Sequence, residues 1–100
     1  MKADFRALIM KDKDNVATAL DDIPAGAAVV LRTEGADLTV ILREAIAFGH
    51  KFAVRPIASS EDIIKYGEVI GMANQPIEAG RHVHVHNLDG KRGRGDQFGA

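Results

Sequence analysis

The sequence contains no cysteine and no tryptophan, and only 5% of its residues are aromatic. The lack of cysteine excludes disulfide scaffolds, thiolate metal sites and cysteine nucleophiles, and it fits the reducing cytoplasm in which we expect the protein. Because large rings are few, the core must come mainly from Ile, Val, Leu and Ala. A core of this kind in a small domain is only modestly stable, which leaves room for completion by a partner.

An excess of charge of either sign is also missing. Thirteen Lys and Arg residues against fourteen Asp and Glu residues give a formal net charge of -1, so a broad attraction to nucleic acid or to an anionic membrane is not expected. No apolar run approaches the roughly 20 residues of a membrane helix. Charged residues also interrupt the first residues, where a secretory signal would be apolar. We therefore expect no nucleic-acid partner and no membrane.

Short runs rich in β-branched residues, separated by turn residues, predict a single all-β domain. Residues 59–67 are ambiguous, because a Ser at the start and Gly67 at the end suit a short helix whereas Ile63 and Ile64 suit a strand. We expect at most one or two short helices, with 60–66 the first candidate, and no helical bundle. The expected strands are 5–10, 16–20, 28–33, 38–43, 51–55, 68–73 and 82–88.

Two further features organise the chain. Residues 1–88 form the predicted domain, and residues 89–100, with four Gly and a basic cluster, form a predicted flexible tail. Segments 22–26, 56–60 and 76–80 share the pattern x-Ile-x-x-small, in which the Ile can fill the core while the small residue makes a tight turn. Ser60 takes the place of Gly in the middle copy.

The four histidines fall in two places, His50 and the alternating run His82, His84 and His86. On one strand these three share a face, whereas Val83 and Val85 face the core. His82 and His86 would then lie ~13 Å apart at the strand rise, too far to bind one metal ion. A neighbouring pair could bind an ion together with His50 or a ligand from another chain. A packed polar interface is the alternative.

Two residues near these histidines have two interpretations each. Lys51 can bind a carboxylate as a point charge, or it can be a solvated residue at a strand end. Tyr66 suits the core with its hydroxyl at the surface better than a hydrogen bond donated into a site. The carboxylate pairs at 21–22 and 61–62 are expected to be turn and cap residues, not an acid/base pair.

Three blocks together resemble a known family, namely 14–26 (DNVATALDDIPAG), 48–58 (FGHKFAVRPIA) and 63–87 (IIKYGEVIGMANQPIEAGRHVHVHN). Their order and spacing are similar to those of the small domain of altronate and galactarate dehydratases, which belongs to the SAF group and has a β-clip fold. The resemblance covers residues 5–88. Ser60 departs from the family's usual Gly, and the large part of such enzymes is not in this sequence.

The resemblance implies a hydro-lyase that removes water from an aldonic or aldaric acid to give a 2-keto-3-deoxy acid. It implies a large dehydratase subunit as partner, and a divalent metal, usually iron, held mainly by that subunit. The chain alone is expected to be inactive, and it can also form a homo-oligomer. The site residues that we expect are His50, Lys51, His84 and His86 in catalysis, Lys51, Tyr66 and Asn87 in substrate binding, and His82 and His84 at the metal.

Two other functions stay open. The small subunit of sulfolactate sulfo-lyase resembles the same blocks, and that enzyme eliminates sulfite from a similar 2-hydroxy acid. SAF-like domains also occur as stand-alone modules that bind carbohydrates or partner proteins. The histidine run and the Gly49-His50-Lys51 segment favour the two enzymes over the binding module.

Overall fold

The computed structural model describes residues 5–33 and 37–90, and within these ranges it contains strands and turns but no helix. The prediction of an all-β domain is therefore confirmed, and the arrangement agrees with a small β-clip fold. No helix in the described ranges is long and apolar enough to cross a membrane. The strands are β1 (Ala7–Leu8), β2 (Val16–Ala19), β3 (Ala28–Arg32), β4 (Asp37–Ile41), β5 (Lys51–Ala53), β6 (Asp62–Lys65), β7 (Glu68–Ala73), β8 (His82–Val83) and β9 (Leu88–Gly90).

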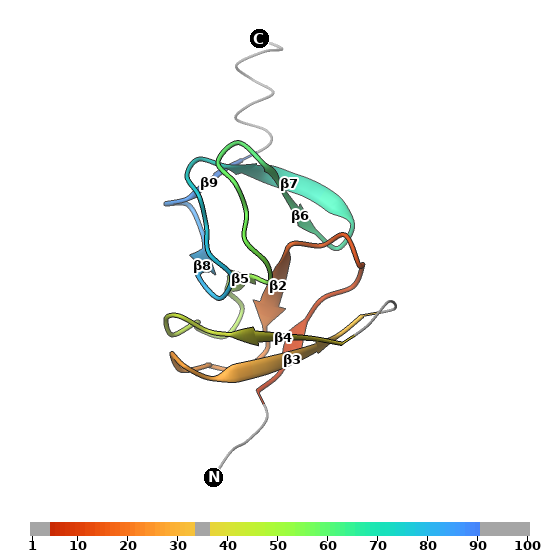
Figure 1. Cartoon of the computed structure of the whole chain (residues 1–100), viewed down its shortest axis with the longest axis vertical. Helices are drawn as coiled ribbons and strands as arrows, with labels where there is room; N and C mark the ends of the chain where they lie inside the picture. Colours follow the sequence, from red (N-terminus) through yellow and green to blue (C-terminus); the bar gives the residue numbers. More distant parts are fainter. Residues whose placement is uncertain (1–4, 34–36, 91–100) are drawn as a thin grey trace.

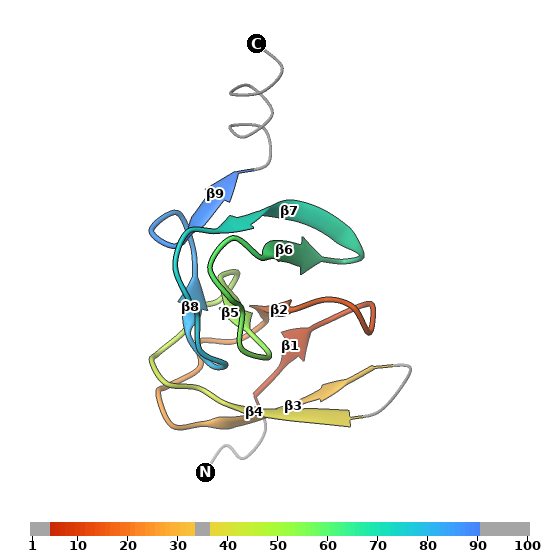
Figure 2. The ribbon, with the colours of Figure 1, turned by 45° about the horizontal axis from the view of Figure 1, so that its top comes forward.

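The strands form three layers. A central sheet with the order β1-β2-β5-β8 lies between the β3–β4 hairpin and a three-stranded sheet with the order β6-β7-β9. Figure 1 shows the hairpin below the central strands and β6, β7 and β9 above them. Figure 2 shows the same succession of layers after the molecule is tilted. The central sheet therefore has a core on each side.

Alternation along the central strands divides their side chains between these two cores. Val16, Ala53 and Val83 pack with residues of β6 and β7. Ala17 and Phe52, which are paired across β2 and β5, pack instead with residues of β3 and β4. Successive side chains of a strand point to opposite faces, so the same alternation decides on which side of the sheet each functional residue lies.

Four similar turns connect the layers, one more than the sequence repeat indicated. Ile23 and Ile46 form one isolated β-bridge, and Ile57 and Ile77 form another. Three residues after each Ile the backbone adopts a positive φ, at Gly26, Gly49, Ser60 and Gly80. The fourth copy, at 45–49, fits the same pattern x-Ile-x-x-small but was not among the predicted ones. Ser60 keeps the left-handed conformation of the Gly that it replaces.

Within 59–67, residues 62–65 form β6 between two turns, so the expected helix at 60–66 is wrong. Lys65 pairs with Glu68 across a two-residue turn, and both central residues, Tyr66 and Gly67, have positive φ angles of 55° and 83°. Two positive φ values are typical of the type I′ turn, whose twist suits a β-hairpin. The isoleucines belong to β6, and the Gly that resembled a helix stop belongs to this turn.

The other predicted strands are confirmed with different bounds, except 82–88, which is strand only at its two ends, in β8 and at the first residue of β9. The strands expected at 16–20, 28–33, 38–43 and 51–55 end one or two residues early, the first strand is reduced to two residues, and 68–73 coincides with β7. Residues 89 and 90 of the expected tail belong to β9, and 91–100 lie outside the described residues. β3 and β4 pair antiparallel, and residues 34–36 between them lie outside the described residues.

Candidate functional site: a histidine cluster

All four histidines gather at one end of the β5–β8 pair. His82 lies at the centre, with ring centroids 5.1 Å from His50, 5.3 Å from His84 and 5.5 Å from His86. Nδ1 of His50 and Nε2 of His82 are 2.9 Å apart, which is a hydrogen bond whose direction depends on the tautomers. The structure therefore joins the isolated histidine to the histidine run, as the sequence suggested.

The histidine run reaches this arrangement by a turn and not along one strand. β8 ends at Val83, and the backbone N–H groups of Asn87 and Leu88 both donate to the carbonyl of His84. The turn brings His86 back beside His82, so the expected separation of ~13 Å along a strand is wrong. Val85 is 78% exposed, so its predicted place in the core is also wrong.

Two side chains hold this turn in place. Asn87 is buried, and its Oδ1 accepts from the N–H of His84 while its Nδ2 donates to the carbonyl of His82. A carboxylate oxygen of Glu44 accepts the backbone N–H of His82. Asn87 was expected to bind substrate, but in the structure its amide hydrogen-bonds to the backbone of His82 and His84 and so holds these two histidines in position.

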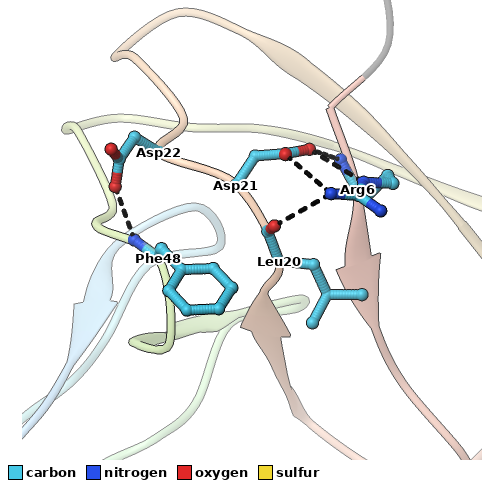
Figure 3. Close-up of polar contacts among 5 residues, drawn as sticks. All are labelled: Arg6, Leu20, Asp21, Asp22 and Phe48. Carbon is cyan, nitrogen blue, oxygen red and sulfur yellow. Dashed lines mark hydrogen bonds and ion pairs between the residues drawn. The ribbon is translucent and has the colours of Figure 1, made fainter.

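The turn that carries His50 has its own support, which involves one member of a carboxylate pair (Figure 3). Oδ1 of Asp22 accepts the backbone N–H of Phe48 at 2.8 Å. The neighbouring Asp21 accepts from the backbone and guanidinium of Arg6, at 2.8 and 3.1 Å. Both carboxylates therefore serve turns and chain ends, as the sequence predicted for this pair.

The protonation of His82 follows from its surroundings. Burial lowers its pKa, and the neighbouring imidazoles of His50, His84 and His86 lower it further, while Glu44 acts in the opposite direction. A neutral imidazole can accept a proton or bind a metal ion. The cluster therefore presents at least one histidine in the form that either role requires.

The geometry of the cluster fits a divalent metal ion in part. One nitrogen from each of His50, His82 and His84 lies within 4.8 Å of the others. An ion with bonds of about 2.0–2.1 Å holds its ligand atoms about 3 Å apart, so the rings would have to close in slightly. Neutral imidazoles suit iron, zinc and nickel. His50 thus joins the two residues that were expected at a metal, and His86 is not among the three.

A hollow of about 350 Å³ opens beside the cluster. His82 and His86 form one part of its wall, and Arg81 and Glu78 form another, where the guanidinium Nε of Arg81 lies 3.2 Å from a carboxylate oxygen of Glu78. A small polar molecule in this space would meet two imidazoles, the guanidinium of Arg81 and the carboxylates of Glu44 and Glu78.

Lys51 and Tyr66 do not join the histidines. Lys51 pairs with Thr18 and with Val83 across the central sheet, so its side chain leaves the face opposite that of Phe52 and His82. Tyr66 is partly buried, and its hydroxyl donates to Oγ1 of Thr18 at 3.1 Å. The two residues expected to bind substrate beside the histidines form a separate group on the other side of the sheet.

The sequence reasoning missed a buried polar pair, Asp14 and Asn15. Asp14 accepts the backbone N–H groups of Met10, Lys11 and Gly67. The amide of Asn15 bridges to β6, where it donates to the carbonyl of residue 62 and accepts from residue 64. The signal that the sequence offered for this pair is its position directly before the predicted strand 16–20.

Comparison with known proteins agrees with the resemblance of the sequence blocks. A family model described as the altronate/galactarate dehydratase SAF domain matches residues 5–91. The altronate dehydratase of Escherichia coli (strain K12) is 49% identical over 74 residues, and that of Bacillus subtilis (strain 168) is 40% identical over 75 residues. The (2R)-sulfolactate sulfo-lyase subunit alpha of Paracoccus pantotrophus is 35% identical over 63 residues.

These matches cover very different shares of the relatives. The alignments include 74% and 75% of this chain but only 14% of either altronate dehydratase. The alignment to the sulfo-lyase subunit includes 63% of this chain and 94% of that protein. The chain therefore spans a small part of the two dehydratases and is comparable in extent to a separate subunit.

Proposed function

This chain belongs to the altronate/galactarate dehydratase SAF domain family, and from that membership we propose that it is the SAF component of a sugar-acid dehydratase. A larger component supplies the rest of the active site. The single observation that carries the proposal is the convergence of four imidazoles beside an open hollow in a member of this family. The absence of cysteine suits the reducing cytoplasm in which we place this enzyme.

The chemistry of dehydration indicates what the histidines contribute. A base removes the proton from C2 of the acid, an acid protonates the hydroxyl that leaves C3 as water, and the resulting enol becomes the 2-keto-3-deoxy product. His82 is kept neutral by burial and can accept a proton, which its hydrogen bond can pass to His50. His86 lines the hollow and can donate a proton to the leaving hydroxyl.

The alternative role for three of these histidines is as ligands: a divalent metal bound by His50, His82 and His84 would supply positive charge to oxygen atoms of the substrate, and the proton at C2 would then be removed by a base of the larger component. Three histidines leave coordination positions open, which suits a metal that is shared with ligands of the larger component. Iron is the metal that we propose, because the family resemblance implies it and imidazole is one of its accepted ligands.

A chimeric enzyme tests this function. The region of the E. coli altronate dehydratase that aligns with this chain is replaced by residues 5–91, and the product is measured as a 2-keto-3-deoxy acid. We expect the chimera to dehydrate altronate, whereas an enzyme from which the region is deleted should not. If the chimera folds and is as inactive as the deletion, the proposed function is wrong.

A sulfo-lyase is the second candidate, favoured by the alignment that includes 94% of a sulfo-lyase subunit alpha. Elimination of sulfite needs the same removal of a proton beside a carboxylate, but sulfite leaves in place of water. The two functions are separated by supplying the chain with the large component of either enzyme, and measuring sulfite released from sulfolactate against keto acid formed from altronate.

A further inference from the structure

A second polar group lies on the other face of the central sheet, away from the histidines. It consists of Lys51 on β5, Thr18 on β2, Lys65 on β6 and Tyr66 in the turn after β6. Thr18 and Lys51 are cross-strand partners, the hydroxyl of Tyr66 donates to Thr18, and Nζ of Lys65 lies 4.9 Å from the centroid of the Tyr66 ring. These contacts join the four residues into one surface.

The positive charge of this group is only partly offset within the protein, because the cross-strand partner of Lys65 is the exposed Glu68 and the carboxylate of Asp14 lies below the turn. Both lysines are partly buried, and no ion pair links either of them to an acidic residue in ranges 5–33 and 37–90. Both ammonium groups lie around the same Tyr66–Thr18 pair, because Lys51 is the cross-strand partner of Thr18 and Nζ of Lys65 lies over the Tyr66 ring. An anion at this pair would be attracted by both charges.

Additional lysines strengthen this field. A Cβ built on Gly67 would lie 3.2 Å from the side chain of Lys11 and 3.8 Å from that of Lys13, so these side chains cover the same turn. Asp14 lies beneath them, but its two oxygens already accept backbone N–H groups. Its charge offsets part of this field, but the backbone holds the carboxylate in place, so it does not form an ion pair with the lysines.

The hydroxyl groups are arranged to donate to such an anion. Tyr66 gives its proton to Oγ1 of Thr18, which leaves the hydroxyl proton of Thr18 for another acceptor. In a chain of hydrogen bonds each bond polarises the next, so Thr18 becomes a better donor. An oxyanion at this point would receive one hydroxyl and two ammonium groups.

Backbone strain indicates that the position of Tyr66 is not incidental. Its φ of 55° is left-handed, a conformation that is unfavourable for a bulky residue. Asn followed by Gly is the usual choice for a type I′ turn, yet Tyr occupies the first position here. Residues held in such conformations often cluster at ligand-binding sites.

We propose that Lys51 and Lys65, together with the hydroxyl of Thr18, bind a carboxylate on the face of the central sheet opposite the histidine cluster. The oxyanion class follows from the donors, whereas the choice of a carboxylate rests on the proposed function. The carboxylate belongs either to a free sugar acid or to an acidic side chain of the larger component. The site is therefore separate from the hollow beside His82 and His86.

A titration of the chain tests the site without relying on enzyme activity. Galactarate is added and followed by the amide NMR signals of β5 and β6, with the uncharged polyol galactitol as ligand control. We expect saturable shifts with galactarate only. Lys51→Met should weaken binding about tenfold, as for the loss of one charge-assisted hydrogen bond. Arg32→Met, which removes a cation at an exposed ion pair elsewhere, should leave it unchanged.

A further variant guards against an effect of misfolding. Tyr66→Asn relieves the strained backbone and removes the hydroxyl, so we expect weaker galactarate binding without lower stability. In the chimeric dehydratase, Lys51→Met distinguishes the two sources of the carboxylate. A higher KM with unchanged thermal unfolding indicates the sugar acid, and a lower unfolding temperature with unchanged KM indicates a side chain of the larger component.

The results that overturn the proposal differ from those that overturn the dehydratase function. An inactive chimera removes the function but leaves the titration of the chain to decide the anion site. If Lys51→Met changes neither the galactarate titration of the chain nor the KM or unfolding temperature of an active chimera, the anion site does not exist.

Discussion

At the scale of single residues, Asp14 shows how one buried carboxylate connects three parts of the chain. Burial alone raises its pKa, but backbone N–H groups of Gly67, Lys11, Met10 and Tyr66 together hold the pKa below its usual range. Arg55 donates to the carbonyl of the same residue at 2.6 Å. The carboxylate therefore fixes the turn before β2 against the turn after β6.

We expect Asp14→Asn to destabilise the chain by about 1–3 kcal/mol at pH 7, because the amide nitrogen cannot accept the donated N–H groups. Asp37→Asn, which removes an exposed partner of Arg32, should cost no more than about 1 kcal/mol. Urea unfolding of both variants measures these differences. Equal losses would show that the enclosed carboxylate has no special role.

The Asp14→Asn variant also tests how the contribution of Asp14 to stability depends on pH. Because the pKa of Asp14 is lower in the folded protein, its contribution is complete above the unfolded value of about 3.9 and is lost as the pH falls through the folded value. The stability gap between the wild type and Asp14→Asn should therefore be constant from pH 7 to 5 and narrow only below about pH 4. A gap that narrows already between pH 7 and 5 contradicts this assignment.

The four histidines also differ from one another in whether their nitrogens lie close enough together to share a metal ion. His84 belongs to the three imidazoles whose nitrogens lie within 4.8 Å, whereas His86 does not. In the chain stripped of metal, cobalt(II) binding followed by its visible absorption should weaken at least about tenfold in His84→Ala, since the loss of even a supporting residue costs that much. His86→Ala is the matched control and should bind cobalt(II) as the wild type does. The reverse order would move the metal site.

At the scale of elements, the four Ile-x-x-small turns support the fold unequally. Gly26 and Gly80 both have positive φ angles, of 86° and 88°. A Cβ on Gly26 would meet no atom within 4 Å, but a Cβ on Gly80 would overlap the carbonyl oxygen of Ile41. Only the turn at Gly80 therefore needs Gly for space as well as for conformation.

Substitution by Ala should separate these two requirements. Gly26→Ala should cost about 1 kcal/mol for the left-handed backbone, and Gly80→Ala about 1–3 kcal/mol more for the overlap with a packed strand. Denaturant unfolding of the two variants provides the comparison. Equal losses would mean that β4 shifts freely away from the turn at Gly80.

The elements also show what the sequence could predict. Runs rich in β-branched residues predicted β2, β3, β4 and β7 nearly in full, because the alternation of apolar residues in these strands depends only on the local sequence. The end of β8 was not predictable in this way. The alternation of His and Val continues past Val83, and the chain turns because the side chain of Asn87 reaches back to two backbone groups. A contact of this kind leaves no periodic signal.

The candidate site was predicted as a set of residues but not as an arrangement. The sequence identified all four histidines as candidate site residues. Their arrangement around His82 could not be predicted, because it depends on the turn at Asn87. Lys51 follows His50 directly in the sequence, yet strand alternation sends its side chain to the opposite face. Neighbours in sequence were thus assigned to one site although the sheet separates them.

At the scale of the whole molecule, the central sheet organises both stability and function. It has one core against β3 and β4 and another against β6 and β7. Its margins carry the histidine cluster on one face and the lysine group on the other. The histidine cluster lies beside an open hollow at the surface, which agrees with a component that a larger protein completes.

The central claim is that the histidine cluster acts in chemistry and not in packing, and His50→Ala in the chimeric dehydratase tests it most directly. Turnover of altronate and thermal unfolding are measured on the same preparation. We predict that turnover falls at least ~10²-fold, the lower range for the loss of an acid/base group, while the unfolding temperature barely changes. Near-normal turnover, or a loss of stability in its place, would contradict the account.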